Sequence, residues 1–433
     1  MVETGDKITF LQSQVAGLKQ ALAELRLIGR IAQEVCGSDS VDEINERILT
    51  MCVRHFDAEQ GAIHLICPCD QQAVLRTEVR AKTAVRVRQN SGVLPVRLGI
   101  GLTGWVAKYH RPLLSNDLPC DPRFSGASAE APHIHSVLAV PLRTHSAFIG
   151  ILTLFNKRAP SGFEEEDQRV LCIIGGYSAQ LIENAQLHAK QKQRDEELLA
   201  AAVIQRGLLP QCPPRIAGLE ACGYSLPARE VGGDYFDWAP LPDGRLGCVL
   251  ADVSGKGIAS AILMAQLQAA FKAQLQVDAS PAAALDGINR FLAQSMETDR
   301  FVTMFYGVAD PNAHSLTWAC AGHNPPCVVG SDGAIRSLEG GGMLLSRVSR
   351  LPYVQLTTPF EKGDTLIVYS DGVTDAEAPD GRQWGIDGLR AVISQSVGLN
   401  PHDLAERIRQ LLRQHVGDAE QFDDITMAIV HHT

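Results

Sequence analysis

Hydrophobic positions near the start of the chain repeat at helical spacing. Between residues 8 and 28 the apolar residues are four, three, four and three positions apart: Leu11, Val15, Leu18, Leu22 and Leu25. A seam of this heptad type predicts a helix over residues 1–28 that pairs with a second copy of the chain as a coiled coil. An amphipathic helix that lies on its own domain has the same pattern, so both interpretations stay open.

Residues 29–185 predict a mixed unit of helices and strands. A helix is expected after Ser40, a suitable N-cap, with Asp42 and Glu43 in its first turn. The next runs are rich in β-branched and apolar residues, as strands are: "GAIHLIC", "SVLAVPL" and "FIGILTLFNK". Helical spacing then returns in "FEEEDQRVLCIIGGYSAQLIENAQL". The expected order is therefore helix, strands, loop, strands, helix.

Residues 186–209 predict a helical linker. This segment consists of helix-forming residues without Gly or Pro as far as Gly207, and prolines from Pro210 onward end the helix. A helix in this position can pass a twist or a register shift from one domain to the next. A domain boundary is expected near residue 210.

In residues 210–433 short β-branched runs alternate with two helical stretches, and aspartates stand where the runs begin or end. Five aspartates hold such positions: Asp234 after a glycine pair, Asp252 in "LADVSGKG", Asp371 in "YSDGVTDA", and Asp423 and Asp424 in "DDIT". Burying several carboxylates together is prohibitive unless cations neutralise them. One such aspartate alone would be an ordinary turn residue. Their recurrence at four strand ends favours a shared metal site.

The predicted site contains only oxygen ligands. Without Cys or His, such ligands suit Mg²⁺ or Mn²⁺ rather than Zn²⁺ or Cu²⁺. Two of these ions, roughly 3.5–4 Å apart, can share a bridging water, lower its pKa and hold a phosphate for in-line attack. Gly255 and Gly257 follow Asp252 and would let a phosphate approach the backbone closely. The pattern predicts metal-assisted phosphate chemistry.

The composition of the chain excludes some classes of partner and indicates the compartment in which the protein is expected. The chain has 433 residues, of which 45% are hydrophobic and 20% charged, and a formal net charge of -10. This acidic balance argues against nucleic acid or an anionic membrane as the main partner. No apolar run approaches a membrane span of about 18 residues, and the first residues do not resemble a signal peptide. A cytoplasmic protein is expected.

The middle of the first unit contains "GLTGWVAKYHRPLLSNDLPCDPRF", and with the surrounding order of elements it resembles a GAF domain. The resemblance implies a central antiparallel sheet with helices on one face and a pocket for an unknown small molecule or protein. Some cyclic-nucleotide-binding GAF domains share Asn156, Lys157, Phe163 and Asp167, but Gln168 stands here in place of their Glu. A salt bridge from Lys157 to Asp167 that pins the sheet to the last helix is the alternative interpretation.

The C-terminal motifs "VGGDYFD", "ADVSGKG", "AGHNPP", "YSDGVTDA" and "DDIT" resemble, in this order, the metal-dependent Ser/Thr protein phosphatases. The similarity is to their bacterial branch of sporulation stage II and stress-response phosphatases. It implies an α-β-β-α sandwich, and thus an α+β protein with a binuclear Mn²⁺ or Mg²⁺ centre. The metal ligands and catalytic residues that it implies are Asp234, Asp252, Asp371 and Asp423, with the backbone carbonyl of Val253.

Three points of this resemblance stay open. The wider family has Asn after its final Asp, so either Asp423 or Asp424 is the last metal ligand. Arg229 stands five residues before Asp234, where relatives place a phosphate-binding Arg, although a solvated surface Arg fits equally well. The run "GGGMLLSRVSRLPY" departs from the family pattern, which leaves the choice of substrate undetermined.

The resemblances imply a signalling phosphatase that acts on phosphoserine or phosphothreonine of a partner protein, such as an anti-sigma-factor antagonist of the STAS type. Metal-activated water would hydrolyse the phosphate, the GAF domain would regulate the enzyme, and residues 8–28 and 186–205 would form a homodimer. A catalytically silent scaffold is the alternative, although all predicted ligands are intact. The triplet Gly232-Gly233-Asp234 also occurs in diguanylate cyclases, but Tyr235 and the other aspartate motifs argue against one.

Overall fold

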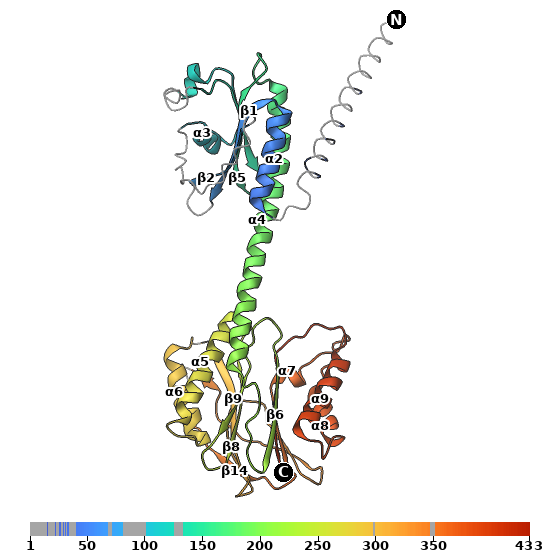
Figure 1. The fold of residues 1–433 in the computed structure, drawn as a ribbon. Coiled ribbons are helices and arrows are strands. Elements are labelled where there is room, and N and C mark those ends of the chain that lie inside the picture. Colours follow the sequence, from blue (N-terminus) through green and yellow to red (C-terminus); the bar gives the residue numbers. More distant parts are fainter. Residues whose placement is uncertain are drawn as a thin grey trace. The chain divides into compact units, whose positions relative to one another are not determined.

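The structure is a computed structural model that describes residues 40–67, 72–80, 101–124, 133–297, 299–346 and 351–433, with isolated positions before residue 40. The chain divides into two units, Met1–Arg194 and Asp195–Thr433. One helix, α4 (Glu165–Leu208), contributes residues to both units and contains most of the predicted linker (Figure 1). The predicted N-terminal coiled coil at 8–28 lies outside the fully described residues.

A five-stranded antiparallel sheet forms the centre of the first unit. Its strand order is β2 (Gln72–Arg80), β1 (Ala58–Cys67), β5 (Phe148–Lys157), β4 (Val137–Arg143) and β3 (Leu113–Ser115). The helices are α2 (Val41–His55) and α3 (Gly101–Tyr109), and two short 3-10 turns cover Leu118–Cys120 and Pro122–Phe124.

The two faces of this sheet are covered differently. Leu138 and Val140 of β4 point into a core with α2 and the first part of α4, whereas Val137 and Ala139 point to the α3 side. This two-residue alternation is the geometry of a strand with both faces buried. Figure 1 shows α2 and α4 on one face and α3 on the other. The predicted antiparallel sheet is confirmed, but the expectation that helices cover only one of its faces is wrong, because α3 packs against the other face.

Lys157 and Asp167 form the predicted salt bridge. The Lys157 ammonium lies 2.5 Å from the Asp167 carboxylate, and both side chains are largely buried. The preceding residue, Asn156, has a φ of 53° and donates hydrogen bonds to Glu59 and to the His133 carbonyl. These residues therefore tie β5 to its neighbours and to the start of α4, which is a structural role.

Two sheets, two pairs of longer helices and the short helix α7 build the described part of the second unit. The first sheet has the order β14 (Leu356–Pro359), β10 (Ser315–Ala321), β9 (Phe301–Asp310), β8 (Leu246–Val253) and β7 (Tyr235–Pro240), and β13 (Leu345–Ser346) also pairs with β9. The second has the order β12 (Ile335–Ser337), β11 (Cys327–Val329), β15 (Thr365–Tyr369), β16 (Ile425–His432) and β6 (Leu219–Leu226). The helices are α5 (Ile258–Leu275), α6 (Pro281–Ser295), α7 (Asp371–Thr374), α8 (Gly385–Ser394) and α9 (Pro401–Val416).

Alternating side chains divide this unit into four layers. In β15, Leu366 and Val368 face the core between the sheets, while Ile367 and Tyr369 face α8 and α9. The opposite surface of the first sheet packs against α5 and α6. Strands with both faces buried read as continuous apolar runs, as the sequence shows. The predicted α-β-β-α sandwich is confirmed.

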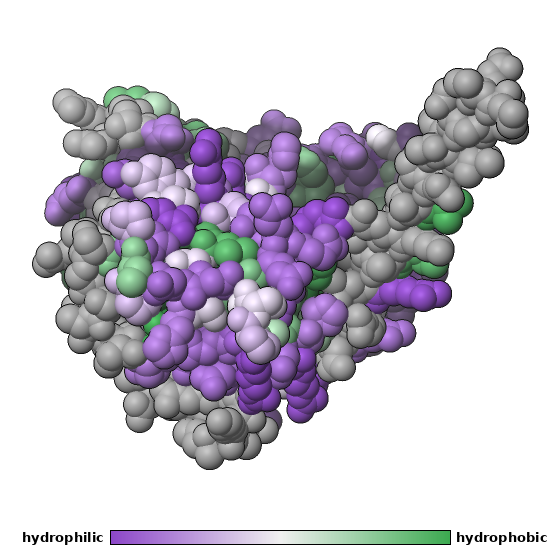
Figure 2. All heavy atoms as spheres, turned by 90° about the horizontal axis from the view of Figure 1, so that it is seen from above, coloured by the Kyte–Doolittle hydropathy of each residue, from purple (hydrophilic) through white to green (hydrophobic). Residues whose placement is uncertain are grey.

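The face seen in Figure 2 is predominantly hydrophilic, and its hydrophobic patches are small. Among the described residues no helix is both long enough and apolar enough to cross a membrane.

Candidate metal centre

The first sheet of the sandwich brings Asp234 and Asp252 to the same edge. Asp234 directly precedes β7, and Asp252 is the penultimate residue of β8. The two strands are antiparallel neighbours in which Tyr235 pairs with Ala251, so the start of one lies beside the end of the other. The residues are 18 positions apart in the chain, but strand pairing makes them neighbours.

The second sheet supplies the other three aspartates. Asp371 follows β15 and begins α7, and Asp423 and Asp424 directly precede β16. Tyr369 pairs with Met427, which places the end of β15 beside the start of β16. Strand β16 also contacts β7 and β8 of the first sheet. The five predicted aspartates thus gather at one edge of the sandwich.

The carboxylates of this cluster repel one another in a largely buried place. Burial, followed by the charge of Asp252, raises the pKa of Asp234 well above its ordinary value. Burial and the charges of Asp371 and Asp423 raise the pKa of Asp252 to about 7. Burial and the charge of Asp423 also raise the pKa of Asp371. Three carboxyls therefore resist ionisation as long as no cation is near.

A divalent cation fits this donor set. The Oδ2 atom of Asp234 is buried without a hydrogen-bond partner, and a buried carboxylate oxygen needs a donor or a cation. The side chains are near enough to shift one another's pKa, yet among the described residues no three His, Cys, Asp or Glu side chains are already arranged around an ion. Asp423, for example, faces Lys256, with 3.4 Å between Oδ2 and Nζ. Small side-chain rotations would have to complete the site.

Asp424 holds the loop that precedes Asp234. Its Oδ1 accepts a hydrogen bond of 2.7 Å from the Ala228 amide, and its Oδ2 accepts one of 2.6 Å from Gly233 and one of 3.3 Å from Asp234. Both carboxylate oxygens are therefore engaged by backbone amides. This buried side chain works as an anchor between two distant segments of the chain.

The glycine pair before Asp234 is required by close approaches. A Cβ at Gly232 would lie 2.5 Å from Asp424 Oδ2, and a Cβ at Gly233 would lie 2.8 Å from the Val253 carbonyl oxygen. Both distances are too short for real Cβ atoms. The missing side chains let the loop reach Asp424 and bring Asp234 beside β8.

Comparison with known proteins agrees with this geometry. Residues 242–433 match the family of Stage II sporulation protein E (SpoIIE), and residues 38–183 match the GAF domain family. The chain joins a GAF domain to a SpoIIE-type domain. Asp252, Asp371 and Asp423 lie within the matched range, and Asp234 lies shortly before it.

Several relatives of the SpoIIE-type domain are known. Phosphoserine phosphatase RsbU of Bacillus subtilis is 28% identical over 259 residues, which are 60% of this chain and 76% of RsbU. Phosphoserine phosphatase RsbP of the same organism is 24% identical over 186 residues, which are 42% of this chain and 46% of RsbP. The solved SiaA-PP2C domain of Pseudomonas aeruginosa shares the fold, with a TM-score of 0.52 at 20% identity over 57% of this chain and 99% of that chain.

Two further residues contact the candidate site. Gln205 lies in the predicted linker and was assigned no part in the site, whereas Lys256 lies in the glycine-rich turn after Asp252, where the sequence left both a phosphate contact and simple solvation open. The side-chain amide of Gln205, near the end of α4, donates to the Gly232 carbonyl at 2.7 Å and accepts from the Gly232 amide at 3.0 Å. Lys256 donates to the Phe422 carbonyl, and its ammonium lies 3.8 Å from the centre of the Phe422 ring. Both contacts join segments far apart in the chain, and the glycines around Lys256 were the only local signal.

Other polar residues of the SpoIIE-type domain have structural partners. Asp237 is buried, lies 2.6 Å from the Lys272 ammonium and accepts a hydrogen bond of 2.7 Å from Tyr235. His323 is buried, its Nδ1 lies 2.9 Å from the Thr303 hydroxyl, and burial lowers its pKa to about 4. Neither has the surroundings of a metal ligand in this structure.

Proposed function

We propose that this protein is a metal-dependent phosphatase that hydrolyses phosphoserine or phosphothreonine on a partner protein. The single observation that supports it most is the group of aspartates with raised pKa values at one sandwich edge, with the unpartnered Asp234 Oδ2 among them. The similarity to RsbU and RsbP, both phosphoserine phosphatases, supports the same substrate class. An anti-sigma-factor antagonist of the STAS type remains the proposed kind of substrate.

We propose that two Mn²⁺ or Mg²⁺ ions bind at this edge. Asp234, Asp252, Asp371 and Asp423 would hold them, together with the carbonyl oxygen of Val253. When bound, such ions supply charge neutralisation and an activated water for attack on a phosphate. Their binding would also relieve the repulsion that raises the carboxyl pKa values.

The proposal assigns Asp424 a positioning role instead of a metal bond. Its oxygens accept the amide hydrogens of Ala228, Gly233 and Asp234, which leaves them poorly placed for an ion. Arg229 follows the first of these anchors and is exposed, so its guanidinium is free to turn toward a bound phosphate. Lys256 stands beside Asp423 and would offer a second positive charge there.

Regulation is proposed to act through α4. This helix starts in the GAF unit, and near its end Gln205 binds Gly232, two residues before Asp234. An unknown small molecule or protein at the GAF domain would change the position of this helix end and hence the order of the metal ligands. Cyclic nucleotides, nucleic acid and membranes are not part of the proposal, and a cytoplasmic location stays a prediction.

The decisive test is hydrolysis by the full chain. We expect p-nitrophenyl phosphate and a phosphoserine peptide to be hydrolysed with Mn²⁺ or Mg²⁺ and not with EDTA. Asp252→Asn should lower kcat/KM roughly 100-fold or more, because it removes a charge that helps to hold the ions. Asp243→Asn is the matched control, since Asp243 is exposed and pairs only with its neighbour Arg245.

A different result would favour the catalytically silent scaffold. Absence of hydrolysis with either metal, at protein concentrations where the folded chain binds Mn²⁺ in calorimetry, would exclude the proposed activity. Equal activity of Asp252→Asn and the parent chain would exclude the proposed metal site.

A further inference from the structure

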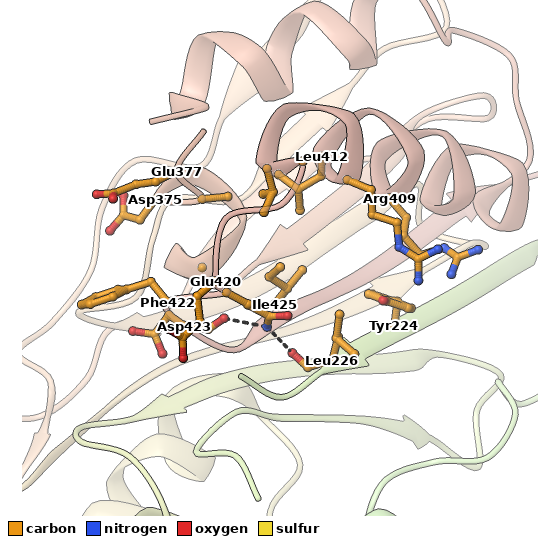
Figure 3. A pocket seen from close by; sticks show the side chains of 16 residues that line it. Tyr224, Leu226, Asp375, Glu377, Arg409, Leu412, Glu420, Phe422, Asp423 and Ile425 are labelled. Carbon is orange, nitrogen blue, oxygen red and sulfur yellow. Dashed lines mark hydrogen bonds between the residues drawn. The ribbon is translucent and has the colours of Figure 1, made fainter. Parts of the chain in front are cut away.

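A pocket of about 260 Å³ opens directly beside the candidate metal centre. Strand β6, helix α9, the start of α7 and the segment 417–425 form its walls. Asp423 lines the pocket (Figure 3). Gly372, which directly follows Asp371, also lines it. A molecule whose phosphate lies at the metal centre can therefore extend into this pocket without crossing open surface.

The charge of the pocket lining differs between the two ends of the pocket. Asp375 and Glu377 lie toward one end and Arg409 toward the other in Figure 3, with Leu412 between them. Arg413 also lines the pocket and is exposed. Leu226, Val416 and Ile425 add to the apolar part of the lining. Mainly apolar walls with a few placed polar groups are typical of binding pockets.

Hydrogen bonds hold the walls in place. The Gln421 side chain donates to the Leu226 carbonyl at 3.0 Å and to the Asp423 carbonyl at 2.8 Å. Arg409 pairs with Glu406 at 2.5 Å, with its guanidinium 5.8 Å from the centre of the Tyr224 ring. The two hydrogen bonds of Gln421 join β6 to the backbone of Asp423, which lines the pocket.

We propose that this pocket selects the phosphoprotein substrate by the residues next to its phosphoserine. An apolar side chain of the substrate fills the middle of the pocket, and an acidic side chain beyond it pairs with Arg413. The proposal rests on the proposed phosphatase activity and specifies its substrate class. Arg413 is the proposed contact because Arg409 pairs directly with Glu406 at 2.5 Å, whereas Arg413 acts on Glu406 only through its charge. Asp375 and Glu377 are the carboxylates at the other end of the pocket. They lie near the proposed ions, and these ions attract the phosphate of the substrate.

Kinetics with matched peptides test this assignment in the full chain. A set of phosphoserine peptides would place leucine or alanine, and glutamate or lysine, at each position near the phosphoserine. We expect the best leucine–glutamate peptide to exceed its alanine–lysine counterpart about 10-fold in kcat/KM, mainly through KM. Each value is divided by the kcat/KM for p-nitrophenyl phosphate, which is too small to fill the pocket.

Two variants separate the apolar wall from the basic end. Leu226→Ser should remove the preference for leucine, and Arg413→Glu should reverse the preference between glutamate and lysine. Arg407→Glu is the matched control, because Arg407 is exposed on the same helix and does not line the pocket. It should retain both preferences.

The outcomes distinguish this proposal from the phosphatase activity itself. If p-nitrophenyl phosphate is hydrolysed but all peptides react equally, or if Arg413→Glu and Arg407→Glu behave alike, the pocket assignment is wrong and the activity stands. If nothing is hydrolysed, the activity is wrong. Fluorescence anisotropy of the labelled peptides with the same variants then decides the pocket alone, and equal binding of all peptides would refute it.

Discussion

Asp423 and Asp424 are adjacent in the chain but have opposite surroundings. Asp424 is buried and engaged by three backbone amides, whereas the Asp423 side chain is about a third exposed and faces Lys256. A carboxylate whose two oxygens both accept amide hydrogens is stabilised without a metal. Among the described residues, Asp423 accepts a hydrogen bond of 2.9 Å only from the Asp424 amide, on Oδ1, so its Oδ2 can exchange the Lys256 ammonium for an ion. The two residues should therefore respond differently to the same substitution.

Asp424→Asn should lower the free energy of unfolding by about 1–3 kcal/mol, because it leaves buried amides unsatisfied. Asp423→Asn should leave the stability of the metal-free protein nearly unchanged and weaken Mn²⁺ binding at least roughly 10-fold. Urea unfolding in EDTA and titration calorimetry with Mn²⁺ measure the two effects. The reverse pattern would make Asp424 the metal ligand.

The raised pKa of Asp252 predicts how stability depends on pH in the absence of metal. Its pKa is about 7 in the folded state and near its ordinary value of 3.8 in the unfolded chain. The folded state therefore holds the proton more tightly, and this contribution to stability is complete below pH 4 and is lost as pH rises through 7.

In EDTA, the free energy of unfolding should consequently fall between pH 5 and pH 8. Asp252→Asn should flatten this dependence, and saturating Mn²⁺ should oppose it because the ion favours the ionised carboxylates. Urea denaturation across this pH range measures the slope. A stability that rises with pH in EDTA, or an unchanged slope in Asp252→Asn, would contradict the repulsion that we infer among the aspartates.

At the scale of elements, the end of α4 and the loop before β7 form a single hydrogen-bonded unit. Gln205 binds both the amide and the carbonyl of Gly232, and Asp424 binds the next two amides. The loop that presents Asp234 is thus held from two sides. How well this loop is ordered therefore depends on α4, a helix that starts in the other unit of the chain.

Gln205→Ala should weaken Mn²⁺ binding roughly 10-fold, as is common when a residue that orients a metal ligand is removed. Gln211→Ala is the matched control, because Gln211 bonds only to the backbone of Arg206 and Leu209 nearby. Titration calorimetry gives the affinity, and thermal unfolding in EDTA reports any general loss of stability. Equal Mn²⁺ affinity in both variants would show that α4 does not position the metal site.

At the scale of the whole molecule, α4 carries apolar side chains that no described residue covers. Leu199 and Val203 are 59% and 69% exposed and stand one helical turn apart. Such exposed residues on a long helix favour pairing with a second copy. We therefore propose that two copies of the chain form a homodimer through this surface of α4.

Sedimentation velocity of the full chain at micromolar concentration should show a dimer. Replacing both Leu199 and Val203 by glutamate should shift it to a monomer. Lys190→Glu is the control, since helix geometry places Lys190 opposite Leu199. A monomeric parent chain, or a dimer that survives the double substitution, would contradict pairing through this helix.

Much of the fold could be predicted because it depends on local patterns. Apolar runs such as the one before Asp371 mark strands buried on both faces, and the motifs that resemble a known phosphatase family implied the sandwich. The contacts of the site could not be predicted in this way. Asp424 reaches Ala228 and Gly233 across 196 and 191 positions, and Lys256 reaches Phe422 across 166.

The sequence by itself determined which residues stand at the strand ends, because alternation and turn chemistry act between near neighbours. The order of the layers was implied only by the resemblance to a known phosphatase family. Only the tertiary structure decided what each of these residues faces. The antiparallel pairing of β7 with β8 and of β15 with β16 brings the carboxylates to one edge. The same packing turned Asp424 toward backbone amides, paired Asp237 with Lys272 and opened the pocket beside Asp423. These outcomes depend on which distant segments meet, and no local pattern contains that information.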